Sequence, residues 1–138
     1  MTMSDVIDLP EWIPASGHQL RMTGVHFDAL RIEGVRGELV AARLIEAADG
    51  DAGPVVCEVT GFRWMYFLLA PGEVRRHNWP LGVQRFGGVG MRTVTYIGIP
   101  ALDGNTWPLR WYSEPTGTAP FVEGGLLAGI TASVMIRA

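Results

Sequence analysis

The sequence contains no lysine, only one cysteine, and no apolar run long enough to cross a membrane. The lone Cys57 excludes an internal disulfide, and its place in a hydrophobic stretch predicts a small buried side chain. The N-terminus, MTMSDVIDLPEW, lacks the basic and apolar regions of a secretory signal. We therefore expect a cytoplasmic protein that does not contact a membrane.

Residues that bind metals or act as nucleophiles are few and scattered. The three histidines lie in different segments, and none has a second ligand at helical or strand spacing. The serines lack the glycine frame of a nucleophile elbow. Asp28 and Glu58 could project from neighbouring strands as a two-carboxylate site, or they could be solvated charges at strand ends. We expect no metal, no cofactor and no catalytic residue.

The strongest pattern in these 138 residues is a hairpin near the middle of the chain. Two β-branched and aromatic stretches, Val55–Thr60 and Trp64–Ala70, flank the turn Gly61-Phe62-Arg63. The second stretch, WMYFLLA, has no polar position that would face water, which predicts a central strand covered on both faces.

The rest of the chain predicts elements that cover this hairpin. Residues His26–Glu33 alternate as a strand, with Phe27, Ala29 and Arg31 on one face. A helix is expected from Gly34 to Ala48, where Val35, Leu39, Ala42 and Ile45 or Glu46 recur at helical spacing. Further strands are expected at Gly82–Phe86, Arg92–Ile99 and Trp107–Tyr112 (an edge strand because of Pro108), and a last helix over Phe121–Ile136.

These elements predict one α+β domain over residues 26–138. It should contain a mainly antiparallel sheet with the helix Gly34–Ala48 on one face. Residues 1–25, broken by prolines and glycines, are expected to form a loose N-terminal arm that Trp12 and Ile13 anchor to the body.

Charge is distributed unevenly along the chain. Residues 1–60 carry a net charge of −6, whereas residues 61–112 carry +4, and every basic residue is an arginine. A GC-rich coding sequence would produce this bias, and so would planar, bidentate recognition of phosphate or carboxylate. Five arginines could gather at one rim of the sheet as an anion-binding site, or each could be solvated or paired with the acids of residues 1–60. They are Arg63, Arg75, Arg76, Arg85 and Arg92.

Residues 61–115 carry a family resemblance. The segment GFRWMYF, a later Gly87-Gly88 turn, and TYIGIP running through Gly104 into Arg110-Trp111 match the order and spacing of a known pattern. The chain in this region resembles the N-terminal primase/polymerase domain of archaeo-eukaryotic primase type, which uses carboxylates to hold two divalent ions and a histidine to contact nucleotide phosphates.

The departures from that pattern bear on activity. Trp64 stands at the histidine position, Val83 at that of the third acid, and Asp28 is a single acid where the family has a pair. Ala101 replaces the serine that follows the paired prolines. The resemblance, with these departures, implies a degenerate domain that kept the scaffold and lost the catalysis.

Three functions follow as hypotheses. The first is a non-catalytic binding or regulatory module on this scaffold, engaging a nucleotide, a nucleic acid or another anionic ligand through the arginines. The second is a protein-interaction domain that uses Trp79, Trp107 and Trp111 as anchors. The third is a small enzyme that uses Asp28 and Glu58. Salt weakens phosphate contacts but not apolar interfaces, which separates the first two. The sequence leaves the oligomeric state open.

Overall fold

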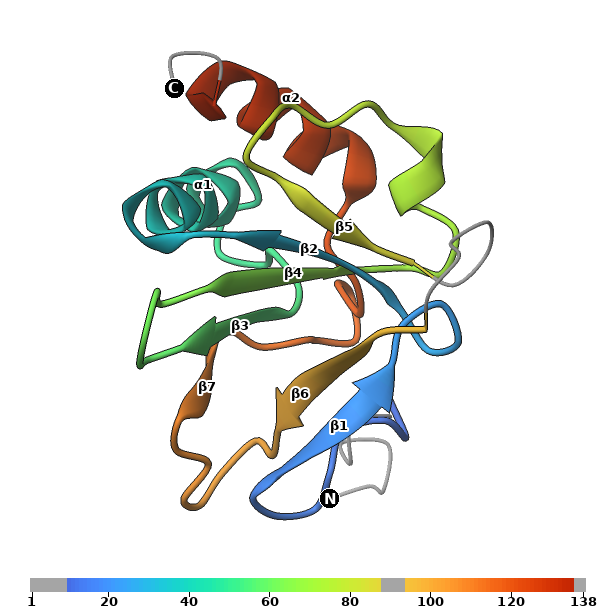
Figure 1. The fold of residues 1–138 in the computed structure, drawn as a ribbon, viewed down its shortest axis with the longest axis vertical. Coiled ribbons are helices and arrows are strands. Elements are labelled where there is room, and N and C mark those ends of the chain that lie inside the picture. The colour runs from blue at the N-terminus through green and yellow to red at the C-terminus, as the bar shows by residue number, and fades with distance from the viewer. Residues whose placement is uncertain (1–9, 88–93, 136–138) are drawn as a thin grey trace.

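The computed structural model of the chain describes residues 10–87 and 94–135. These residues form a five-stranded sheet, a two-stranded sheet and two α-helices, and every strand pair is antiparallel (Figure 1). The prediction of a single α+β domain with a mainly antiparallel sheet is confirmed.

The five-stranded sheet is built around the predicted hairpin. Its strands lie in the order β5 (Gln84–Phe86), β2 (Asp28–Ile32), β4 (Met65–Leu69), β3 (Val55–Glu58) and β7 (Leu109–Ser113). β3 and β4 are the two arms of the hairpin, and β4 is the central strand, as its unbroken apolar sequence predicted. β7 is an edge strand, also as predicted.

Both helices lie on one face of this sheet. Helix α1 (Gly34–Ala47) joins β2 to β3, which run parallel with β4 inserted between them, so the unit is a split β-α-β arrangement. Its buried positions, Gly37, Val40, Ala41 and Leu44, recur at helical spacing and face the sheet. The predicted stripe of Val35, Leu39 and Ala42 is exposed instead, because the close approach at Gly37 turns the neighbouring face toward the sheet. Helix α2 (Gly124–Met135) packs beside α1 and completes the layer. A first core of buried side chains fills the space between helices and sheet.

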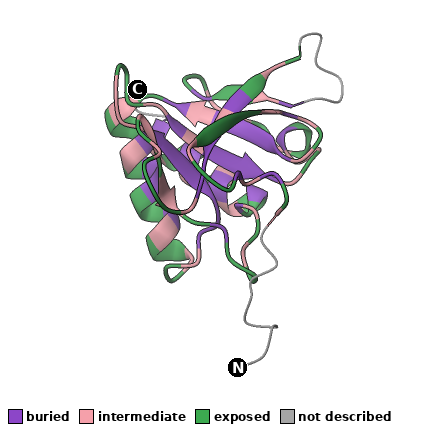
Figure 2. Cartoon of the chain, turned by 90° about the horizontal axis from the view of Figure 1, so that it is seen from below, coloured by how far each residue is buried: buried purple, intermediate pink, exposed green. Residues whose placement is uncertain are grey.

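The second face of the sheet is covered in part by a β-ribbon. Strands β1 (His18–Met22) and β6 (Tyr96–Pro100) pair with each other and enclose a second core that includes Phe27, Leu68 and Ile99 (Figures 1 and 2). β4 is therefore buried on both sides.

The segment expected to be a loose arm contains β1. Its backbone pairs along its whole length with β6, a strand more than seventy residues later in the chain, and this pairing was not visible in the local sequence. Trp12 is 4 % exposed and packs on the rings of Phe27 and Phe121, at centroid distances of 5.0 and 6.4 Å. Trp12 thus anchors the N-terminal segment, as expected.

Strand β6 begins at Tyr96, within the strand predicted at Arg92–Ile99. The expected glycine turn from Gly88 onwards lies outside the described residues, and so does Arg92.

Within the ranges that the structure describes, neither helix has the length and apolar character that crossing a bilayer requires.

Candidate functional site

The structure does not bring the predicted arginines together at one rim. Arg63 lies in the turn that enters β4, whereas Arg75 and Arg76 lie in η2 (Val74–Arg76), beyond the other end of β4. The turns before and after one strand necessarily lie at opposite ends of a sheet, so the expectation of a shared rim was wrong for these residues.

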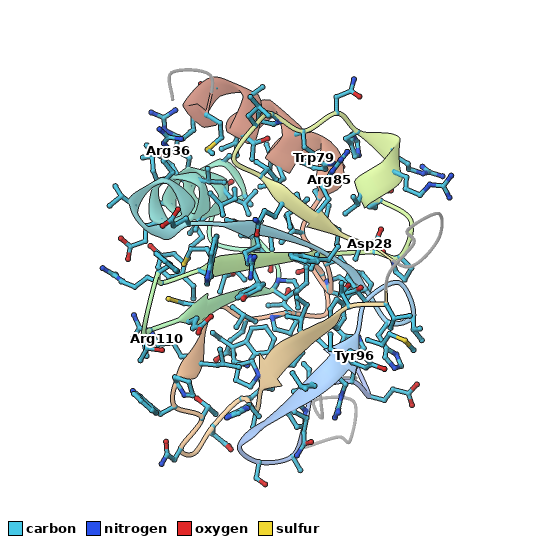
Figure 3. All side chains as sticks on the ribbon, viewed as in Figure 1. Asp28, Arg36, Trp79, Arg85, Tyr96 and Arg110 are labelled. Atoms are coloured by element: carbon cyan, nitrogen blue, oxygen red, sulfur yellow. The ribbon has the colours of Figure 1, made fainter. Side chains whose placement is uncertain are left out.

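The remaining arginines are also separate. Arg85 lies in β5 opposite Leu30, a residue of the first core, so its exposed side chain stands on the helix side of the sheet edge (Figure 3). Arg92 is outside the described residues. Arg63 donates from Nη2 to Oε2 of Glu38 at 2.6 Å, which is the pairing with an N-terminal acid that the sequence left as the alternative.

Of the three predicted tryptophan anchors, two are used internally. The indole N–H of Trp79 donates to the Val74 carbonyl at 2.9 Å, and that of Trp111 donates to the Ala101 carbonyl at 3.1 Å. Both rings are half-buried against the two cores. Trp107, at 68 % exposure, is the one of the three that offers most of its surface to a partner.

Asp28 and Glu58 do not form a two-carboxylate site. Strand β4 separates β2 from β3, and Asp28 pairs with Leu69 at one end of β4, whereas Glu58 lies beyond the other end. Across residues 10–87 and 94–135, no group of three or more His, Cys, Asp or Glu side chains could hold a metal ion.

Asp28 instead has a structural role in the connection that follows β4. It is 2 % exposed, and its Oδ2 accepts hydrogen bonds from the backbone N–H groups of Gly72, at 2.8 Å, and Val74, at 3.1 Å. Burial raises the pKa of this carboxyl, although the two N–H donors oppose the shift. The carboxylate therefore holds the connection that leaves β4, at the end of the sheet where Figure 3 labels it.

A cluster of different composition lies on the ribbon side of the sheet. The Arg31 guanidinium carbon is 4.0 Å from the ring centroid of Trp64 and 5.3 Å from that of Phe86. Arg31 Nε also donates to Gln84 Oε1 at 2.5 Å. In the pairing register Arg31 lies between Gln84 and Tyr66. We call these five residues, Arg31, Trp64, Tyr66, Gln84 and Phe86, the aromatic–arginine surface.

This surface is partly open to solvent and nearly neutral. Gln84 is exposed and the other four residues are half-buried, so the β1–β6 ribbon leaves this part of the sheet accessible. Burial raises the pKa of the Tyr66 phenol; Arg31 acts to lower this pKa, and Glu58 acts to raise it. The rings supply flat apolar contact, and the guanidinium is held in one orientation between two of them.

The sequence contained two signals of this surface. The alternation of His26–Glu33 placed Arg31 on one face with Phe27 and Ala29, and these two residues do lie in the second core. Trp64 stood out as the departure from the histidine of the primase-like pattern. Phe86 lies with Arg31 and Trp64 only because β5 pairs with β2, and no local sequence pattern showed this pairing.

Comparison of the chain with protein-family models, with curated proteins and with solved structures found no match.

Proposed function

We propose that this chain is a non-catalytic binding module that binds a protein partner through the aromatic–arginine surface. The observation that carries the proposal is the Arg31 guanidinium held between the rings of Trp64 and Phe86. Tryptophan, tyrosine and arginine are the residue types that most often dominate binding energy at protein interfaces. Here all three types lie on neighbouring strands, already ordered, so little side-chain entropy would be lost on binding.

Electrostatics favour a protein partner over a polyanion. The chain has a net charge of −3, and Arg31 is the one cation among the five residues of the aromatic–arginine surface. Binding of nucleic acid depends on several cations that neutralise phosphates together, and Arg63 is already paired with Glu38. A mixed aromatic surface with one oriented guanidinium matches a polypeptide that offers apolar side chains and backbone carbonyls.

The primase-like resemblance supports the non-catalytic part of the proposal. In that resemblance position 64 is the histidine that contacts nucleotide phosphates. Here the position holds an indole ring that stacks on Arg31, so the side chain has a packing partner in place of a phosphate. The proposed module would thus use the face of a scaffold that no longer performs catalysis.

Site-specific photocrosslinking tests this function. A photoreactive residue at Gln84, which is exposed on the surface, should give a discrete protein crosslink in cells of the source organism. The same probe at Trp107, exposed on the connection between β6 and β7, serves as the control and should not give that product. Trp64→Ala should reduce the affinity for the purified partner by about tenfold or more.

A fluorescent single-stranded DNA provides the opposing measurement. We expect its anisotropy to stay unchanged with the wild-type protein at low salt. Tight binding that falls steeply with added salt and is lost in Arg31→Ala would assign the surface to nucleic acid and overturn the proposal. The proposal would also be overturned if the probe at Gln84 gave no protein crosslink, or gave one that Trp64→Ala does not reduce.

A further inference from the structure

A groove lies at the end of the molecule where α1 begins. It adjoins the aromatic–arginine surface, because the ring of its lining residue Phe62 is 5.8 Å from the ring of Trp64. Its walls come from four places in the sequence: residues Ile32–Arg36 where β2 leads into α1, Phe62 in the β3–β4 turn, Gly82 before β5, and Met135 at the end of α2. It encloses about 570 Å³. Figure 1 shows α1 and the β3–β4 turn at the left side of the fold, and Figure 3 labels Arg36 on that side.

Large apolar side chains project around this groove. Val35 is 80 % exposed and Phe62 is 66 % exposed, and both line it. Leu81, next to the lining residue Gly82, is 93 % exposed. A side chain at position 82 would come within 2.6 Å of the Met135 methyl group, so glycine there leaves the hollow open beside Leu81. Three exposed hydrophobic residues at one hollow are unusual for a surface that faces only water.

The rim of the groove carries one charge of each sign. Glu33 and Arg36 are both exposed, and within the described ranges neither takes part in a salt bridge. The groove face therefore has one projecting apolar side chain, Leu81, beside a largely apolar hollow. It also has one negative side chain, Glu33, and one positive side chain, Arg36. A twofold interface needs both members of each complementary pair on one face, because each residue meets a different residue of the other copy. This face has them.

We propose that this groove is a self-association face and that its occupant is a second copy of this chain. In a twofold dimer, Leu81 of each copy enters the groove of the other, and Phe62 and Val35 pack around it. Glu33 of each copy faces Arg36 of the other. Such an isologous contact closes after two copies and gives a dimer without further growth.

Sedimentation equilibrium of the full chain, between about 1 and 200 µM, tests the proposal. The wild type should fit a reversible monomer–dimer equilibrium, and Leu81→Ser should weaken it by about tenfold or more. Trp107→Ser removes another highly exposed side chain away from the groove and should leave the dimer unchanged. A wild type that stays monomeric, or a dimer that Leu81→Ser does not weaken, overturns the proposal.

Charge reversal tests the twofold geometry separately. Glu33→Arg or Arg36→Glu alone places like charges opposite each other and should weaken the dimer, whereas the double variant restores opposite charges and should recover it. Thermal melts of the monomeric fraction confirm that each variant is folded. Single variants that dimerise like the wild type, or a double variant weaker than both single ones, contradict the pairing of Glu33 with Arg36.

Discussion

Replacing either of two glycines by alanine should change stability in opposite directions. Gly37 lies in α1, where a Cβ would come within 2.7 Å of both the Ile32 carbonyl oxygen and the Met65 side chain. Gly129 lies in α2, where a Cβ would meet nothing within 4 Å. In both helices alanine gains up to about 1 kcal/mol over glycine from backbone entropy alone.

The difference comes from the closeness of α1 to the sheet. The Ile32 carbonyl belongs to the β2 backbone and cannot rotate away, so the whole helix must shift. Overpacking of this kind costs about 1–3 kcal/mol, which exceeds the propensity gain. Gly37→Ala should therefore lower the free energy of unfolding by about 1–2 kcal/mol, and Gly129→Ala should raise it by about 0.5–1 kcal/mol.

Urea unfolding at constant pH measures both values. The midpoint concentration should fall for Gly37→Ala and rise for Gly129→Ala, with the slope of the transition unchanged. If Gly37→Ala gained as much stability as Gly129→Ala, the close approach of α1 to β2 would be wrong. Unequal slopes would instead show that one variant alters the unfolded state.

Three further changes have expected outcomes. Burial raises the pKa of Asp28 in the folded state above its ordinary value of 3.8. The unfolding free energy of the wild type should therefore fall relative to that of Asp28→Asn as the pH rises from 3.8 through the raised pKa. A difference in unfolding free energy that does not change between pH 3.8 and 8 would contradict this. Leu68→Asp should leave the chain unfolded by circular dichroism, since an unpaired charge in the second core costs several kcal/mol, on the order of the total stability. The double variant Arg75→Ala/Arg76→Ala removes two exposed side chains and should change the unfolding free energy by less than about 0.5 kcal/mol and leave the Gln84 crosslink intact; loss of the crosslink would restore an arginine-based site.

The hairpin and the first helix could be predicted because their signals are local. The apolar run in β4 and the helical spacing within Gly34–Ala48 are each contained within one element. The run in β4 also states that both faces must be covered, whereas the spacing of Val35, Leu39 and Ala42 indicated the wrong face of the helix. The strand β1 could not be predicted in this way. Its sequence, HQLRM, is largely polar, and it is a strand because it pairs with β6.

The candidate site was harder to predict because it depends on strand order. Alternation placed Arg31 on the correct face, but its contacts with Trp64 and Phe86 arise only when β2 lies between β4 and β5. The prediction that the arginines share one rim was wrong for a related reason. Strand direction decides at which end of the sheet a turn lies, and residues that are near in sequence can lie at opposite ends. For Trp79, the use of the indole N–H inside the fold required a carbonyl whose position the sequence does not give.

The pairing of β1 with β6 determines when the second core can close during synthesis. β1 leaves the ribosome early, but its partner begins only at Tyr96, so Trp12 and Phe27 must wait for most of the chain before Ile97 and Ile99 cover them. The first core also needs α2 at the end of the chain, but its contacts between the hairpin and α1 are close in sequence, and contacts of this kind form sooner. A nascent chain that has completed the hairpin thus exposes the second-core face of its central strand until β6 is made, and exposed apolar surface of this kind is prone to aggregation.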